Sequence, residues 1–355
     1  MNAPTRVLCL LAVLCMAVPA LAQFPAPCDT RRDCIFNAVR FSQTTLPSAH
    51  FIDVENSPTT PRQTALTVEL WASIDRQPGK RQFIGGLWGP GTDNNDQWVF
   101  YIDEQDRIVF EINAEATRLG QADNTVARAP FSAHYGQWVH LAAVFDGGAT
   151  SARILINGAV VASATNPAYP VTALKPIERN DLTTRFGACN ALADDQNLYR
   201  TLSGWIDEVR MWSRAVPDAE LLCNKDRSLN GNEAGLVLYY RCNEPVNNNV
   251  QICDATGRRN TGLMRSGASN QRSTRQSTRT ILASPTEITA ELKCDTTISW
   301  TVQFTDTAFC GSTATVRMRG PNASRYTLSQ TNLTLSQNTP IPITVTYNGS
   351  AVGTL

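Results

Sequence analysis

The chain has 355 residues, of which 42% are hydrophobic and 17% are charged. That length and apolar content are enough for two globular domains with separate cores. The 31 basic and 31 acidic residues balance to a formal net charge of +0. Balanced charge, with no long run of one sign, excludes a basic nucleic-acid-binding chain and gives no sign of a polybasic membrane-surface segment.

Residues 1–22 have the pattern of a signal peptide. Arg6 precedes an apolar run at 7–18, and Ala20-Leu21-Ala22 forms a cleavage site before Gln23. Leu14 stands before Cys15, where a lipoprotein signal would carry a small residue. No other stretch approaches the ~20 apolar residues of a membrane span. The sequence therefore predicts a secreted or extracellular protein, with cell-surface association left open.

Removal of the signal leaves an even number of cysteines, which in a secreted chain points to disulfides. They are Cys28, Cys34, Cys189, Cys223, Cys242, Cys253, Cys294 and Cys310. Pairing of near neighbours predicts Cys28–Cys34, Cys242–Cys253 and Cys294–Cys310, which leaves Cys189–Cys223. A zinc site is disfavoured because the chain has no CxxC and its three histidines lack zinc spacing.

Strand patterns dominate the chain after a short cap at 23–37 that contains a CDTRRDC loop. The clearest strand is 65–74, whose apolar residues alternate. The stretch 136–146 is apolar on both faces, which predicts a central strand. Asn157-Gly158 predicts a two-residue hairpin turn between the next two strands.

The stretch 203–222 predicts a strand, a sharp exit and a short helix. In the strand, 204–213, the apolar alternation slips by one residue, which predicts a bulge near Asp207 and Glu208. Pro217 is expected at the start of the helix, whose first turn holds Asp218 and Glu220. Acidic side chains suit the positive end of the helix dipole.

Strands recur without an evident linker from 38 to 267, which predicts an all-β domain, a large antiparallel two-sheet jelly roll. An Arg/Ser/Thr-rich stretch at 268–283 is interpreted as a solvated linker rather than a basic docking patch. Residues 284–355 predict a small Ig-like β-sandwich that ends before its last strand. We expect either that the chain continues or that another chain supplies that strand.

Four spaced blocks carry a family resemblance: TVELWASI, GQWVHLAAVFDGGATSARILINGAVV, SGWIDEVRMWSRAVPDAEL and GLVLYYRCNE with DATGRRNTGLM. Together they resemble the laminin-G-like (concanavalin-A-like lectin/glucanase) jelly-roll modules of secreted bacterial proteins, and pentraxins more distantly. The C-terminal unit weakly resembles the Ig-like repeats of bacterial surface proteins.

The resemblance implies two curved antiparallel sheets of roughly six to seven strands each, and the binding of glycans or proteins, often with calcium. Two departures stand out. Cys242 replaces an aromatic residue that is usual in these modules, which favours its pairing with Cys253. The core disulfide of pentraxins is absent, because Glu69, Leu70 and Leu141 occupy its neighbourhood.

A search for catalytic groups predicts no enzyme. Paired carboxylates of a glycoside hydrolase are best approximated by Asp207 and Glu208. These are adjacent and so point to opposite faces of the strand, which favours a structural role at the bulge. His140 lies in an apolar strand and is interpreted as a core histidine. No G-x-S-x-G, H-E-x-x-H or P-loop motif occurs.

Calcium is the best-supported cofactor hypothesis. The loop at 93–96 gathers carboxylate and amide oxygens, the ligands that Ca²⁺ prefers. The resemblance to pentraxins implies a second ligand group in a loop at 190–195. The predicted ligands are Asp93, Asn94, Asp96, Asn190, Asp194 and Asp195, with Asn95 beside them. The alternative is that these are ordinary turn residues, since Asn and Asp are common in turns.

Three aromatic residues near these loops are candidates for stacking on sugar rings: Trp88, Trp98 and Tyr199. Packing in the core is the alternative for both tryptophans. The sequence thus predicts a recognition module for carbohydrate or a matrix-like ligand, with Ca²⁺ as its candidate cofactor. The alternative is an adhesion or scaffold protein that makes only protein contacts. No nucleic-acid partner and no transmembrane segment are expected.

Overall fold

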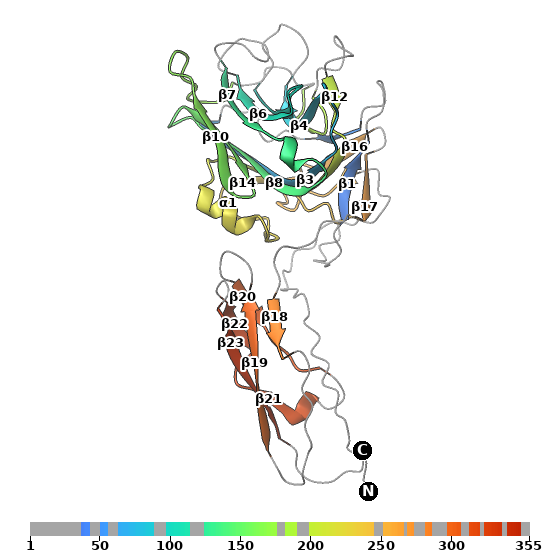
Figure 1. Cartoon of the computed structure of the whole chain (residues 1–355), viewed down its shortest axis with the longest axis vertical. Coiled ribbons are helices and arrows are strands. Elements are labelled where there is room, and N and C mark those ends of the chain that lie inside the picture. Colours follow the sequence, from blue (N-terminus) through green and yellow to red (C-terminus); the bar gives the residue numbers. More distant parts are fainter. Residues whose placement is uncertain are drawn as a thin grey trace. The chain divides into compact units, whose positions relative to one another are not determined.

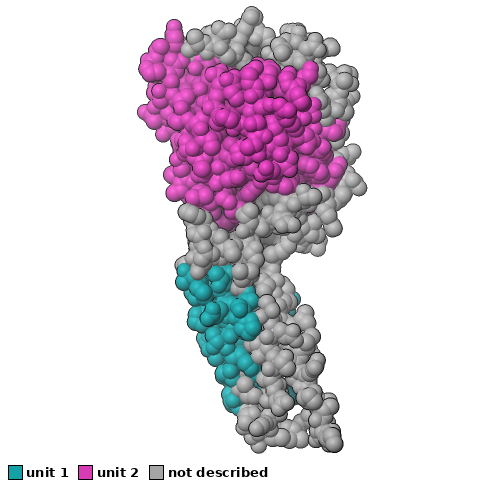
Figure 2. Space-filling view, viewed as in Figure 1, with its two compact units in different colours: residues 1–22, 276–355 teal, residues 23–275 magenta. Residues whose placement is uncertain are grey.

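The computed structural model describes residues 37–42, 50–55, 63–88, 97–113, 124–175, 182–189, 199–244, 251–265, 268–272, 281–285, 297–306, 312–319, 323–335 and 339–348. They form two compact units, one within 23–275 and one within 276–355 (Figure 2). Strands make up most of both units, as the sequence predicts.

The first unit is a jelly roll built from two antiparallel sheets (Figure 1). One sheet has eight strands among the described residues, in the order β10-β9-β8-β3-β13-β1-β17, with β14 also on β13. Their bounds are β1 Asn37–Phe41, β3 Ala65–Ile74, β8 Trp138–Asp146, β9 Ser151–Ile156, β10 Ala159–Thr165, β13 Gly204–Trp212, β14 Leu236–Tyr240 and β17 Ser269–Arg272.

The other sheet has nine strands among the described residues, in the order β15-β16-β2-β11-β4-β5-β6-β7, with β12 also on β4. Its pairing is antiparallel except between β12 and β4. The bounds are β2 Phe51–Val54, β4 Arg81–Leu87, β5 Trp98–Ile102, β6 Arg107–Ile112, β7 Thr125–Pro130, β11 Arg185–Phe186, β12 Tyr199–Thr201, β15 Gln251–Ile252 and β16 Gly262–Arg265.

The core lies between the two sheets. The side chains that alternate inward from both sheets form one large apolar cluster, with Leu70 and Leu141 from one sheet facing Phe100 and Phe110 from the other. All four are fully buried. Removing this much apolar surface from water is the main favourable term for folding.

A helix covers the outer face of the eight-stranded sheet. Helix α1 (Asp218–Asn224) follows β13, with Pro217 as the residue before its first turn and Asp218 and Glu220 in that turn. Leu221 packs with Trp212 and Tyr239 of the sheet in a second apolar cluster. The predicted exit from strand to helix is confirmed.

The predicted bulge in β13 is also confirmed. The register with β3 shifts between Asp207 and Arg210, and Glu208 has a positive φ of 52°. The hairpin prediction at Asn157-Gly158 is likewise confirmed, since both residues have positive φ and join β9 to β10. A short 3-10 helix, η1 (Ser132–His134), precedes β8.

The predicted linker at 268–283 contains the boundary between the two units, at 275/276, but both of its ends are strands. Residues 269–272 form β17, which pairs with β1 at the edge of the eight-stranded sheet. Residues 281–284 form β18, which pairs with β19 in the second unit. Polar composition suggested a linker, but an edge strand needs only backbone hydrogen bonds along one side and tolerates polar side chains on the other.

The second unit is a small β structure with its own core. Its sheets have the orders β18-β19-β23-β21 and β20-β22 among the described residues. Val302, Phe304, Leu333, Leu335 and Ile343 are buried at its centre. The bounds are β18 Ile281–Ser284, β19 Ile298–Asp306, β20 Ser312–Thr315, η2 Ala323–Arg325, β21 Tyr326–Leu328, β22 Asn332–Leu335 and β23 Ile341–Tyr347.

Candidate functional site

The outer face of the nine-stranded sheet has a polar half over β16, β2 and β11. Asp53 is at its centre and accepts hydrogen bonds from Thr183 and, at 3.2 Å, from the Arg185 guanidinium. Arg265 lies 4.0 Å from the other carboxylate oxygen of Asp53. The Arg185 guanidinium stacks on Phe51 at 4.5 Å from the ring centroid.

The strand register explains why these side chains meet. Arg185 and Leu263 both pair with Asp53, and Arg265 pairs with Phe51, so all of them project from the same face. The side chains of Asp53 and Arg185 are 19% and 16% exposed, and that of Arg265 is 48% exposed. This half of the face therefore offers partly accessible charged and aromatic groups held in fixed geometry.

The other half of the same face, over β4 to β7, is apolar and buried. Phe83 and Tyr101 stack with ring centroids 5.6 Å apart. They cluster with Trp88 and Val109, and Cys189 joins the same group. The Arg81 guanidinium lies 5.2 Å from the Tyr101 ring centroid.

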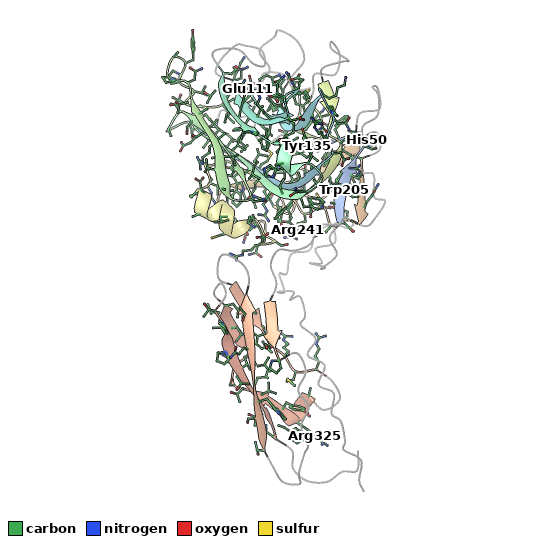
Figure 3. All side chains as sticks on the ribbon, viewed as in Figure 1. His50, Glu111, Tyr135, Trp205, Arg241 and Arg325 are labelled. Carbon is green, nitrogen blue, oxygen red and sulfur yellow. The ribbon has the colours of Figure 1, made fainter. Side chains whose placement is uncertain are left out.

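A buried carboxylate stands within this apolar half. Glu111 is 0% exposed and accepts hydrogen bonds from the Tyr101 hydroxyl at 3.2 Å and from Asn124 Nδ2 at 2.6 Å. Burial, together with the Glu111 charge, raises the pKa of Tyr101 well above its usual value. Tyr101 therefore stays protonated and serves as a fixed donor. Figure 3 shows Glu111 on the side of the unit away from Arg241.

The candidate sugar-stacking tryptophans are not exposed. Trp98 is 0% exposed and faces the main core from β5, because it pairs with Leu87 and Ile112, which also face inward. Trp88 is 3% exposed and packs in the apolar half of the outer face. The prediction of exposed platforms is therefore corrected to core packing at both positions. For Tyr199 the structure describes the backbone alone, in β12.

All six predicted calcium ligands lie outside the described residues. The strands that flank their loops are described, however. Residues 89–96 follow the Leu87 end of β4, whereas 190–198 lead to Tyr199, which pairs with Arg81 at the other end. A seven-residue strand is about 20 Å long. Trp88 and Tyr199, the described residues that adjoin these two segments, thus lie at opposite ends of β4.

Among the described residues, no group of three His, Cys, Asp or Glu side chains is placed to hold a metal ion.

Two predicted disulfides are wrong. Cys223 and Cys253 are each disulfide-bonded, whereas their expected partners, Cys189 and Cys242, are buried thiols. Cys242 has a positive φ of 54°, and burial raises the pKa of its thiol well above the usual value. Pairing of sequence neighbours failed because the fold, not chain distance, decides which sulfurs meet. Cys28, Cys34, Cys294 and Cys310 lie outside the described residues.

The eight-stranded sheet carries a buried charge network that the sequence did not reveal. Glu69 accepts hydrogen bonds from Trp212 Nε1 at 3.0 Å, and its Oε2 lies 2.9 Å from His140 Nε2. Arg210 forms an ion pair with Glu208 at 2.7 Å and donates to the carbonyl of Asn224 at the end of α1. The network joins the sheet to its helical cover, so the interpretation of His140 as a core residue is confirmed.

Asp53 and Arg185 were also missed. Asp53 is a charged residue within the alternating stretch FIDV, which is a usable signal, whereas Arg185 in TTRFG has no such pattern around it. Their juxtaposition was not readable, because it joins residues separated by 132 positions.

Comparisons with known proteins agree on the fold. The Laminin_G_3 family model, described as the concanavalin A-like lectin/glucanases superfamily, matches residues 48–222. A protein of Bacteroides ovatus described as a candidate carbohydrate-binding protein matches with a TM-score of 0.50 and 22% identity over 67% of this chain. The alignment spans 60% of that protein's length. A search of the curated proteins found no match.

Two weaker structural matches are the heptameric SAP-like pentraxin of Limulus polyphemus and a Ruminococcus gnavus sialidase CBM40 bound to α2,3-sialyllactose. The pentraxin has a TM-score of 0.44 and 15% identity over 68% of this chain and 97% of its own. The CBM40 has a TM-score of 0.39 and 12% identity over 51% of this chain and 94% of its own.

Proposed function

We propose that the protein is a secreted or cell-surface recognition module that binds carbohydrate, because residues 48–222 match the model of the concanavalin A-like lectin/glucanases superfamily. The ligand surface is the polar half of the outer face of the nine-stranded sheet. The observation that carries the proposal is the half-buried Asp53–Arg185 pair beside the Phe51 ring.

The chemistry of that surface suits a sugar. Sugars offer hydroxyl groups that both donate and accept, so a carboxylate and a guanidinium are complementary partners. The Phe51 ring, on one face of which Arg185 stacks, adds an apolar surface for the C–H groups of a sugar. The opposite sheet is a less favourable surface, because α1 covers much of its outer face.

Secretion and calcium are parts of the proposal. The signal-peptide pattern at 1–22 supports secretion. No helix among the described residues is both long and apolar enough to cross a membrane. Asp93, Asn94 and Asp96, with Asn190, Asp194 and Asp195, are the residues that would hold a calcium ion. The bound ion would be a hard cation that can take hydroxyl oxygens of a sugar as ligands. Structural adhesion through protein contacts alone is the alternative function.

The test is binding of the intact, labelled protein to an array of immobilised glycans, with added calcium and with a chelator. We expect a glycan signal that is strongly reduced in Arg185→Ala. In that variant Asp53 still accepts the hydrogen bond from Thr183 and still lies beside the Arg265 guanidinium, so the fold should persist. Absence of any glycan signal in both buffers would refute carbohydrate binding. A signal equal with and without chelator would refute the calcium part alone.

Trp205→Ala is the matched control. Trp205 is a partly exposed aromatic residue on the eight-stranded sheet, with the Arg40 guanidinium 5.2 Å from its ring centroid. It therefore repeats the aromatic–arginine chemistry on the other side of the sandwich. Loss of binding in Trp205→Ala but not in Arg185→Ala would show that the ligand binds the eight-stranded sheet, which would contradict this proposal.

A further inference from the structure

The exposed large apolar side chains among the described residues lie on one strand and just after it. They are Val160, Val161 and Tyr169, which are 48%, 41% and 54% exposed. Val160 and Val161 belong to β10, and Tyr169 follows it by four residues. A register shift between Val160 and Ala162 marks a bulge, which explains why two consecutive valines are both exposed. Two adjacent exposed valines differ from the usual scattered single exposures.

β10 is also the last strand of the eight-stranded sheet. It pairs with β9 on one side and with no described strand on the other. The backbone N–H and C=O groups along that free edge are therefore available to another strand. In Figure 1, β10 borders the jelly roll on the side opposite β1 and β17.

Among the described residues, a bulge is the one protective device found at this edge. Residues 154–174 contain no charged residue. By contrast β7, the edge of the other sheet on the same side, carries an exposed Arg128 and ends at Pro130. The short edge strand β15 has two residues, and β17 ends at Arg272. Charges, proline and short length protect an edge, and β10 relies on its bulge alone.

We propose that β10 pairs antiparallel with β10 of a second copy of this chain, so that two eight-stranded sheets continue across a two-fold axis. The occupant follows from the composition of the strand. In an antiparallel pair related by a two-fold axis the same residues face each other, so an uncharged strand meets an uncharged strand without repulsion. The apolar side chains of Val160, Val161 and Tyr169 are buried in the same step.

Contacts with α1 fix the position of β10. Gly158 in the hairpin turn lies against Leu222 of α1, so close that an added Cβ would come within 2.5 Å of Leu222 Cδ1. Arg153 of β9 donates to Asp218 at 2.8 Å. These contacts fix the β9–β10 hairpin against the helix, and a rigid edge loses little conformational entropy when it pairs.

Sedimentation velocity and light scattering of the intact protein test the proposal. We expect a concentration-dependent dimer with a dissociation constant on the order of micromolar, as befits a small interface. Val161→Lys should weaken the dimer by about tenfold or more, because two like charges then meet near the axis. The melting temperature of its monomer should match that of the wild type.

Thr334→Lys is the matched control, since Thr334 is an exposed strand residue of the second unit. It adds the same charge and should leave the dimer intact. Val160→Thr with Val161→Thr keeps β-propensity and removes apolar surface, and should also weaken the dimer. A wild type that stays monomeric up to roughly 1 mM overturns the proposal. A dimer that survives Val161→Lys unchanged also overturns it.

Discussion

Glu69 shows how much a single residue depends on its partners. Its carboxylate is fully buried, which by itself raises its pKa, but Arg210, His140 and Trp212 together lower the pKa below the ordinary 4.5. Arg210 Nη1 lies 3.6 Å from this carboxylate and Nη2 lies 2.7 Å from that of Glu208. Such a network stabilises the fold only while every charge keeps a partner.

The depressed pKa of Glu69 predicts acid sensitivity. A carboxyl group whose folded-state pKa lies below its unfolded value contributes stability that is present above pH 4.5 and lost as pH falls through the folded pKa. Glu69→Gln should therefore lower stability at neutral pH and flatten the decline in acid. Urea unfolding across that pH range measures both effects. An acid decline equally steep in Glu69→Gln would contradict this assignment.

Arg210→Met should be strongly destabilising. It leaves two buried carboxylates, Glu69 and Glu208, without their cation, and breaking a buried pair of this kind costs about 3–5 kcal/mol. Arg76→Met removes the exposed ion pair with Asp106 and should change stability little. Chemical denaturation of both variants provides the comparison. Equal effects of the two substitutions would show that the buried network is not a stability determinant.

At the scale of elements, the sequence predicted what depends on local pattern. The alternation slip in 204–213 located the β13 bulge, and Pro217 located the start of α1. It did not predict what depends on distant partners. β17 was read as linker because its pairing with β1 involves a strand more than 200 residues away. The sequence leaves Trp98 open between sugar stacking and core packing, and its pairing with β4 and β6 places it in the core.

The candidate site shows the same difference between what local pattern predicts and what distant partners decide. Residues 51–54, which carry Asp53, alternate as a strand does, but Arg185 lies in a two-residue strand without that pattern. The ion pair between them requires the sheet order β2-β11-β4. The jelly-roll resemblance supplied the fold without the side-chain positions, since the residues on an outer face vary independently of the pattern that builds the core.

The β9–β10 hairpin offers a test of an element. Gly158 has a φ of +84° and no room for a Cβ, whereas Gly79 has a φ of +63° and nothing within 4 Å. Both alanine variants pay for an unfavourable backbone, at about 1 kcal/mol or more. Gly158→Ala must in addition displace Leu222, so its loss of unfolding free energy should be the larger. Thermal or urea unfolding of the two variants tests this. If Gly79→Ala is the more destabilising, the contact between hairpin and α1 is not as described.

At the scale of the whole molecule, each unit has its own core. The jelly roll is built around the cluster between its two sheets, and the second unit around Val302, Phe304 and Ile343. We expect removal of 276–355 to leave the melting temperature of the jelly roll within about 2 °C of its value in the intact chain. Scanning calorimetry measures it. A large shift would show that the two cores do not unfold independently.

The most direct test of the central claim is a titration calorimetry experiment with one array-identified glycan. The wild type, Arg185→Ala and Trp205→Ala are compared under identical conditions. A binding surface at Asp53, Arg185 and Phe51 predicts that Arg185→Ala weakens binding by about tenfold or more, roughly 1.4 kcal/mol, while Trp205→Ala binds as the wild type does. Wild-type affinity in Arg185→Ala, with its fold intact, would contradict the assignment of carbohydrate binding to the outer face of the nine-stranded sheet.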